Sequence, residues 1–146
     1  MLKGVDPAIT AELLYVLMLM GHGDDLVICD VNHPAATIAK HTTYRKLVAL
    51  GGCTILQATR AILKLMPVDT FVDEPVHRMR VVGDPTKMFP LFDDVRKAVS
   101  EAEDRDVRMG VYERFDFYEA AKKSFAIVRT SDAGPYGCFI LRKGVI

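Results

Sequence analysis

Residues Gly21 to Asp24 combine a histidine, two glycines and a carboxylate, and a second carboxylate, Asp30, follows a short apolar run. A histidine flanked by glycines leaves room for a ligand beside its ring, and the ordinary imidazole pKa of about 6.5 suits proton transfer near neutral pH. The segment therefore favours acid–base chemistry on a small molecule. A structural interpretation is also open, in which Gly21 caps a helix and His22 complements the negative end of the helix dipole.

Two further segments, Arg114–Glu119 and Asp132–Gly137, combine polar and aromatic side chains. Sugar sites use this combination, because carboxylates and arginine bind hydroxyl groups while aromatic rings cover the apolar side of a pyranose. The structural alternative is a surface ion pair for Arg114 and a buried helix face made by its aromatic neighbours, Phe115, Phe117 and Tyr118.

The spacing of His22 and Asp30 constrains any site that uses both. Eight residues separate them, and a straight strand of that length covers about 26 Å. One pocket of a single subunit could not hold both side chains. Either the chain bends back beside the strand, or the site forms across an interface of a symmetric oligomer.

Alternating helix and strand patterns predict a single α/β domain over residues 1–146, with a mixed sheet flanked by helices. Thr10 is expected to cap a helix that Gly21 ends, and Thr54 with Gln57 forms a capping box. Segment 31–43 is expected to be an ordered loop. The predicted helices are 10–20, 54–66, 91–102 and 116–123, and the predicted strands are 26–29, 44–49, 76–82, 107–111, 124–128 and 138–141.

The composition and motifs exclude several classes of function. Lys+Arg and Asp+Glu both number 19, so the chain lacks the basic excess of a nucleic-acid binder. No apolar stretch reaches the ~20 residues of a membrane span, and no signal-peptide pattern begins the chain, which favours the cytoplasm. Phosphate-binding glycine motifs are absent from the sequence. Neither the four histidines nor the three cysteines have metal-ligand spacing, so no metal is expected.

An ordered set of segments extends over nearly the whole chain and resembles the RbsD/FucU family of sugar mutarotases. The resemblance is greater to the fucose mutarotase branch than to the ribose pyranase branch. The segments are Met1–Gly4, Glu12–Leu14, Met20–Asp24, Asp30 with Pro34–Ala35, Leu65–Thr70, Arg114–Glu119, Phe125–Val128, and Tyr136–Gly137 through Leu141–Val145.

The resemblance implies a compact α/β fold without a cofactor and a homo-oligomer, typically a decamer of two stacked pentamers, with sugar bound between neighbouring subunits. It assigns His22 as the proton donor. The substrate-binding residues that it implies are Asp30, Arg114, Tyr118, Tyr136, Gly137 and Cys138.

The implied reaction is interconversion of the α and β anomers of L-fucose, or of a related monosaccharide, by acid–base opening of the ring. Two alternatives remain: a D-ribose pyranase, and a non-catalytic monosaccharide-binding or transport-accessory protein. Two departures from the family bear on the choice of sugar. Cys138 stands where the family commonly has asparagine, and His33 stands where it usually has phenylalanine.

Overall fold

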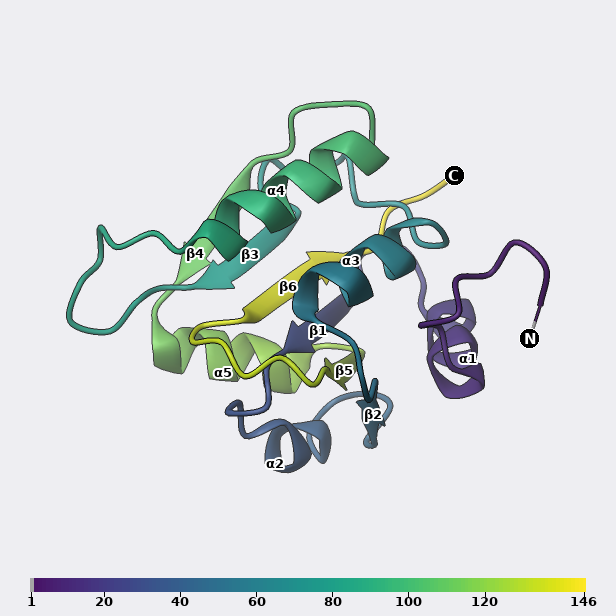
Figure 1. Cartoon of the computed structure of the whole chain (residues 1–146), viewed down its shortest axis with the longest axis horizontal. Helices are drawn as coiled ribbons and strands as arrows, with labels where there is room; N and C mark the ends of the chain where they lie inside the picture. Colours follow the sequence, from purple (N-terminus) through teal and green to yellow (C-terminus); the bar gives the residue numbers. More distant parts are fainter. Residues whose placement is uncertain (1) are drawn as a thin grey trace.

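The strands form one mixed sheet in the computed structural model, which describes residues 2–146. The strand order is β2-β5-β1-β6-β3-β4, so that most neighbours in the sheet are distant in sequence (Figure 1). The predicted α/β class with a mixed sheet is confirmed. The strands are β1 (Asp25–Cys29), β2 (Leu47–Ala49), β3 (Val76–Met79), β4 (Met109–Tyr112), β5 (Ala126–Arg129) and β6 (Cys138–Arg142).

Strand β6 runs opposite to its neighbours β1 and β3, whereas β1, β5 and β2 are mutually parallel, as are β3 and β4. The register pairs Asp25 with Arg142 and Cys29 with Cys138. The start of β6 therefore lies beside the last residues of β1. We call this side, where β1, β3 and β4 end and β6 begins, the carboxyl end of the sheet, and the opposite side the amino end.

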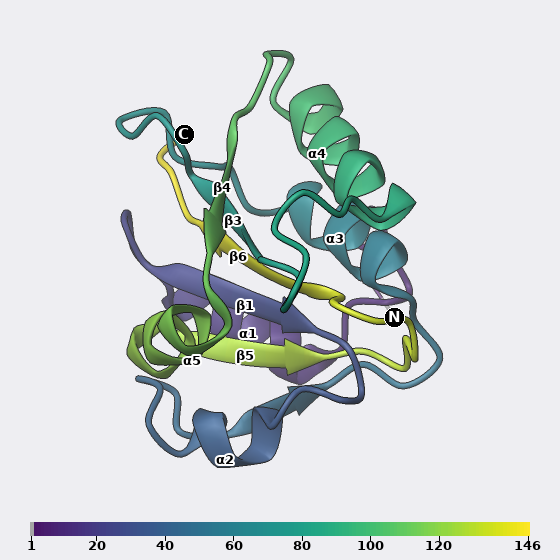
Figure 2. The same ribbon diagram turned by 90° about the vertical axis from the view of Figure 1, so that its left-hand side faces the viewer.

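Helices cover both faces of the sheet, with α3 and α4 on one side and α5 on the other (Figure 2). Leu26 and Ile28 of β1 pack in a cluster with α1, α3 and α4, while Val27 and Cys29 pack with α2 and α5. The predicted strand 26–29 is thus confirmed, and it is buried on both faces of the sheet. The helices are α1 (Ala11–Leu19), α2 (Ala35–Ala39), α3 (Ile55–Leu63), α4 (Pro90–Ala102) and α5 (Arg114–Lys123).

Two helices begin at the threonines that were predicted to cap them. Thr10 Oγ1 accepts the N–H of Leu13 at 3.1 Å. Thr54 Oγ1 accepts the N–H of Gln57 at 3.2 Å, and Gln57 Oε1 accepts the N–H of Thr54 at 2.9 Å. These bonds satisfy N–H groups that the start of a helix leaves without partners.

None of the helices among residues 2–146 has both the length and the hydrophobicity that a membrane span needs.

Gly21 does not cap α1, contrary to the prediction. Met20 ends the helix by turning into an extended conformation (φ −66°, ψ 136°), which buries its side chain. The positive φ of this segment, +82°, lies at Gly23 instead. Lys143 Nζ donates to two carbonyl oxygens at the end of α1, at 2.9 and 2.5 Å. A cation from the other end of the chain, rather than His22, therefore compensates the negative end of this helix.

Segment 31–43 contains the helix α2, where the sequence predicted only an ordered loop. The five residues of α2 make little more than one turn, which is too short for helical periodicity to be visible. Ile38 anchors the turn, because its N–H donates to the carbonyl of Pro34 at 3.0 Å and its side chain packs in the core.

Strand β3 ends at Met79, before the predicted end at Val82. The guanidinium of Arg78 is buried and lies 4.4 Å from the ring centre of Phe92 on α4. The sequence could not show that α4 lies over this strand. The predicted strand 44–49 is also shorter, and other boundaries shift by a few residues.

Candidate functional site

A pocket of about 260 Å³ opens at the carboxyl end of the sheet. Ligands of α/β proteins commonly bind there, because the segments that follow several strands converge. Of the seven predicted site residues, Asp30, Arg114, Tyr118, Tyr136 and Cys138 line this pocket. Four lining residues were not predicted as site residues: Asn32, His33, Met79 and Pro135. Their positions in the sequence could have identified them, because Asn32 and His33 follow Asp30 and Pro135 precedes Tyr136. Met79 is the last residue of β3.

Asp30 follows β1 directly and is only 3 % exposed. Its Oδ1 accepts the N–H groups of Asn32 and His33 at 2.8 and 3.0 Å, and its Oδ2 accepts the N–H of Gly137 at 2.9 Å. The Cys138 thiol lies 3.8 Å from Oδ2. Burial raises the pKa of Asp30, although the three N–H groups oppose this. The thiol contact is the weakest of the four, so Oδ2 is the oxygen that a ligand hydroxyl can approach.

Gly137 allows the backbone before β6 to approach Asp30 closely. A Cβ atom at this position would lie 3.1 Å from Ile55 Cγ1 and 3.2 Å from Asp30 Cβ. The preceding residue, Tyr136, has a left-handed φ of +58°. Its hydroxyl accepts the N–H of Val82 at 3.0 Å, which holds the ring in the pocket wall.

Arg114 and Tyr118 lie four residues apart on α5 and therefore share one face of that helix. Among residues 2–146, no carboxylate lies within ion-pair distance of Arg114, so the surface ion pair considered for it is not formed. Its guanidinium instead lies 4.6 Å from the ring centre of Phe115, which is exposed. The structural alternative required a buried face made by all three aromatic residues of this segment, but only Phe117 is fully buried.

His22 lies at the amino end of the sheet, away from the pocket. Its Nε2 is 3.1 Å from Asp69 Oδ1, which also accepts the N–H of Phe71 at 2.9 Å. The side chain of His22 is 44 % exposed and that of Asp69 only 3 %. A single chain therefore does not bring His22 to Asp30, in agreement with the spacing in the sequence.

The Asp69 carboxylate determines which nitrogen of His22 is free. Burial raises the pKa of Asp69, but the hydrogen bonds from Phe71 and His22 lower it by more, so that the pKa of Asp69 lies below its ordinary value. An ionised carboxylate only accepts hydrogen bonds, so Nε2 carries the hydrogen and Nδ1 is available for proton exchange. Sequence reasoning did not identify Asp69 as a site residue, although it lies in the family-like segment Leu65–Thr70.

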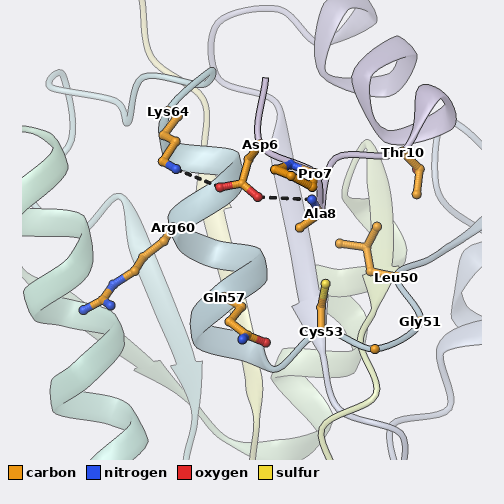
Figure 3. A pocket seen from close by; sticks show the side chains of 11 residues that line it. Asp6, Pro7, Ala8, Thr10, Leu50, Gly51, Cys53, Gln57, Arg60 and Lys64 are labelled. Carbon is orange, nitrogen blue, oxygen red and sulfur yellow. Dashed lines mark hydrogen bonds and ion pairs between the residues drawn. The ribbon is translucent and has the colours of Figure 1, made fainter. Parts of the chain in front are cut away.

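A wider hollow of about 530 Å³ lies beside α3 (Figure 3). It contains no predicted site residue. The ammonium group of Lys64 is paired there with Asp6 at 2.7 Å, and Arg60 is the other cationic residue of the lining. Within residues 2–146, no three His, Cys, Asp or Glu side chains are placed to hold a metal ion. Because five of the seven predicted site residues line the pocket at the carboxyl end of the sheet, that pocket is the candidate site.

Comparison with known proteins identifies the relatives of this chain. The family described as the RbsD / FucU transport protein family matches residues 3–146. The chain belongs to the RbsD/FucU family. It is 40 % identical over 147 residues to the fucose mutarotase of Danio rerio, covering 99 % of this chain and 94 % of the relative. It is also 40 % identical over 149 residues to the fucose mutarotase of Homo sapiens, covering 99 % of this chain and 94 % of the relative.

A solved member of the RbsD/FucU family has the same fold. The fucose mutarotase of Streptococcus pneumoniae, whose crystal structure contains L-fucose, is 36 % identical and superposes with a TM-score of 0.89 over 99 % of both chains. The family resemblance that the ordered segments indicated is thus confirmed, including the greater similarity to fucose mutarotases.

Proposed function

We propose that this RbsD/FucU protein is a sugar mutarotase that interconverts the α and β anomers of L-fucose or a closely related monosaccharide. The observation that carries the proposal is the pocket itself. A buried carboxylate, an arginine with no ion-pair partner among residues 2–146 and two tyrosines surround a space of about 260 Å³. This combination suits hydroxyl groups and an apolar ring face. The relatives named fucose mutarotase support the choice of sugar.

In the proposed complex, Asp30 Oδ2 accepts a sugar hydroxyl in place of the weak thiol contact. Arg114 donates to hydroxyl oxygens, and Tyr118 and Tyr136 line the ring. The backbone turn at Gly137 and the side chain of Cys138 complete the wall beside Asp30. Anomer exchange changes no oxidation state, so the proposed reaction requires no redox cofactor.

The proposed mechanism is general acid–base catalysis. His22 gives a proton to the ring oxygen while the anomeric hydroxyl loses its proton to a base, so the bond from C1 to the ring oxygen breaks and an aldehyde forms. Rotation about the C1–C2 bond exposes the other face of the aldehyde. Closure returns both protons and leaves no net change. Catalysis of this kind contributes about 10²- to 10⁴-fold.

The mechanism requires that His22 reach a pocket of a neighbouring subunit, and α1 offers a surface for such an assembly. Its outward side chains Tyr15, Met18 and Leu19 are apolar or aromatic, and Met18 is 79 % exposed. A helix that is hydrophobic on all sides belongs in a buried position. We propose a ring-based homo-oligomer, a decamer of two pentamers, in which each site combines the His22–Asp69 pair of one subunit with the Asp30 pocket of the next.

A cytoplasmic location accompanies this proposal. Cys29, Cys53 and Cys138 are all free thiols, a state that a reducing compartment maintains.

A non-catalytic sugar-binding protein is the second candidate function, because one subunit forms the pocket without the proton donor. D-Ribose pyranase chemistry is the third, since it uses the same open-chain aldehyde. Exchange NMR on the anomeric protons of L-fucose and of D-ribose at equilibrium separates the three. We expect faster exchange for L-fucose with the wild-type protein and the rate of buffer alone with His22→Ala.

Each other outcome of this experiment has a definite meaning. Pyranose–furanose exchange of D-ribose without an effect on L-fucose would assign the protein as a pyranase. Binding of either sugar with no faster exchange would assign it as a binding protein.

A further inference from the structure

The side chain of His33 forms part of the pocket wall but has only one of its two nitrogens engaged. The residue is 7 % exposed, and its ring meets the rings of Phe117 and Tyr118 edge-on, with centroids 5.7 and 5.3 Å away. Nδ1 lies 3.5 Å from Cys138 Sγ. Nε2 is buried and has no hydrogen-bond partner within residues 2–146. The packing therefore leaves this pocket-wall side chain with one engaged nitrogen and one buried nitrogen that has no partner among residues 2–146.

Burial determines the protonation of the groups involved. It lowers the pKa of His33 to about 4 and raises the pKa of the Cys138 thiol. At neutral pH the imidazole is therefore neutral and the thiol keeps its hydrogen. A neutral imidazole has one N–H donor and one acceptor nitrogen, and the partner of Nδ1 decides which is which.

The hydrogen bonds of Asp30 limit where a sugar hydroxyl can be recognised. A carboxylate has about four acceptor positions, and three N–H groups and the Cys138 thiol occupy them. A hydroxyl that binds Oδ2 displaces the thiol. The S–H group then has Nδ1 of His33 as its acceptor, at 3.5 Å, and this places the ring hydrogen on Nε2.

We propose that the buried Nε2–H group of His33 becomes accessible when sugar enters the pocket and donates a hydrogen bond to one hydroxyl oxygen of that sugar, while Cys138 holds the imidazole in this tautomer. The inference rests on the sugar site proposed above. His33 is then a specificity-determining residue of the pocket. A sugar without the matching hydroxyl leaves a buried N–H unpaired once water is excluded, and such sites reject deoxy analogues strongly.

A cycle of ligand and protein changes tests this hydrogen bond. Binding of L-fucose and of its analogues lacking the C2, C3 or C4 hydroxyl is measured by calorimetry on the intact assembly of the wild type and of His33→Phe. We expect one analogue to bind the wild type at least about ten-fold more weakly than L-fucose, and this loss to fall below about three-fold in His33→Phe. Equal losses in the two proteins for every analogue would overturn the proposal.

Two further variants separate hydrogen bonding from packing. His33→Gln places an amide N–H near the position of Nε2, so it should regain part of the discrimination that His33→Phe loses. Discrimination by His33→Gln no better than that of His33→Phe would indicate a purely structural role and overturn the proposal. His41→Phe, an exposed histidine beyond α2, is the matched control and should discriminate like the wild type.

The same samples distinguish this inference from the proposed function. Anomer exchange of L-fucose by the wild type, together with equal analogue losses in the wild type and His33→Phe, would refute the inference alone. Failure of the wild type to bind L-fucose or speed its exchange would refute the proposed function on which the inference rests.

Discussion

At the scale of residues, the contact between His22 and Asp69 connects the structure most directly to chemistry. Asp69 is buried, its Oδ1 is held by the N–H of Phe71, and Arg105 Nη2 donates to its carbonyl oxygen at 2.8 Å. The carboxylate is therefore fixed before it meets the imidazole at 3.1 Å. A fixed partner on Nε2 orients the ring, and in the proposed mechanism it leaves Nδ1 to exchange a proton with the sugar.

Replacing Asp69 by asparagine should slow anomer exchange without weakening sugar binding. The amide keeps the shape of the side chain but no longer supplies the charge that orients and supports a protonated His22. We expect kcat to fall about ten- to hundred-fold with KM within about two-fold, measured by exchange NMR over a range of L-fucose concentrations. Asp73→Asn, an exposed change in the same segment, serves as the control. Similar losses in both variants, or a loss confined to KM, would contradict a positioning role for Asp69.

The low pKa of His33 predicts a loss of stability in acid. In the folded protein His33 stays neutral down to a pH of about 4, whereas in the unfolded chain it takes up a proton near pH 6.5. The unfolded state therefore binds more protons between these values, and the free energy of unfolding decreases as the pH falls from 6.5 to 4, by about 3 kcal/mol. The raised pKa of Asp30 acts in the opposite direction.

Comparison with His33→Phe isolates this contribution, because both proteins keep Asp30. Denaturant unfolding at fixed protein concentration, repeated between pH 6.5 and 4, should show a steeper loss of stability for the wild type. Parallel curves for the two proteins would show that His33 is not held neutral in the fold.

The sequence identified most of the pocket residues but not their hydrogen bonds. Asp30, Arg114 and Tyr136 could be predicted because carboxylates, arginine and tyrosine near element ends indicate a sugar site. Asp69 was not identified, since its importance depends on a contact with His22 across 47 positions of sequence. The unsatisfied nitrogen of His33 likewise depends on packing against α5, which no local pattern reveals.

At the scale of elements, local hydrogen-bonding chemistry was the most reliable guide. The caps at Thr10 and Thr54 form as predicted because they depend only on residues within the next turn. The prediction for the end of α1 failed because a distant segment decides the outcome there: Lys143 binds the last carbonyl groups of the helix.

Loss of the capping box should destabilise α3 by a measurable amount. Thr54→Ala removes the oxygen that accepts the N–H of Gln57, and such changes cost about 1 kcal/mol. Urea unfolding of the variant should give a correspondingly lower free energy of unfolding with an unchanged m-value. Gln57→Glu preserves the box and should be nearly neutral. Stability equal to that of the wild type in Thr54→Ala would show that the box contributes nothing here.

At the scale of the whole molecule, the sheet separates two groups of chemistry at its opposite ends. The pocket lies at the carboxyl end, and the His22–Asp69 pair lies at the amino end. Strand geometry predicted this separation unless the chain bent back beside the strand. The sequence could not show which surface would join two subunits. The side of α1 that stays exposed is known only once the contacts of its buried side are known.

A charge on the outer side of α1 should disrupt the proposed assembly. Met18→Glu places a carboxylate on a residue that is 79 % exposed, so the subunit should still fold but associate less. Analytical ultracentrifugation should show a smaller particle, and exchange of L-fucose should be lost with it. Lys97→Glu on the exposed side of α4 is the control and should keep the assembly. An unchanged particle size for Met18→Glu would exclude α1 from the interface.

The central claim is that a proton donor from one subunit acts on a sugar held by another, and complementation tests it most directly. His22→Ala and Arg114→Ala each remove one half of the site and should each be inactive alone. After the two proteins are mixed, dissociated and reassembled, random pairing should restore about a quarter of the sites.

Exchange NMR on L-fucose should then detect activity near that fraction of the wild-type rate, with each variant treated alone as the baseline. Reassembled mixtures that show no more exchange than the separate variants, although wild-type protein regains its activity after the same treatment, would contradict a site shared between subunits.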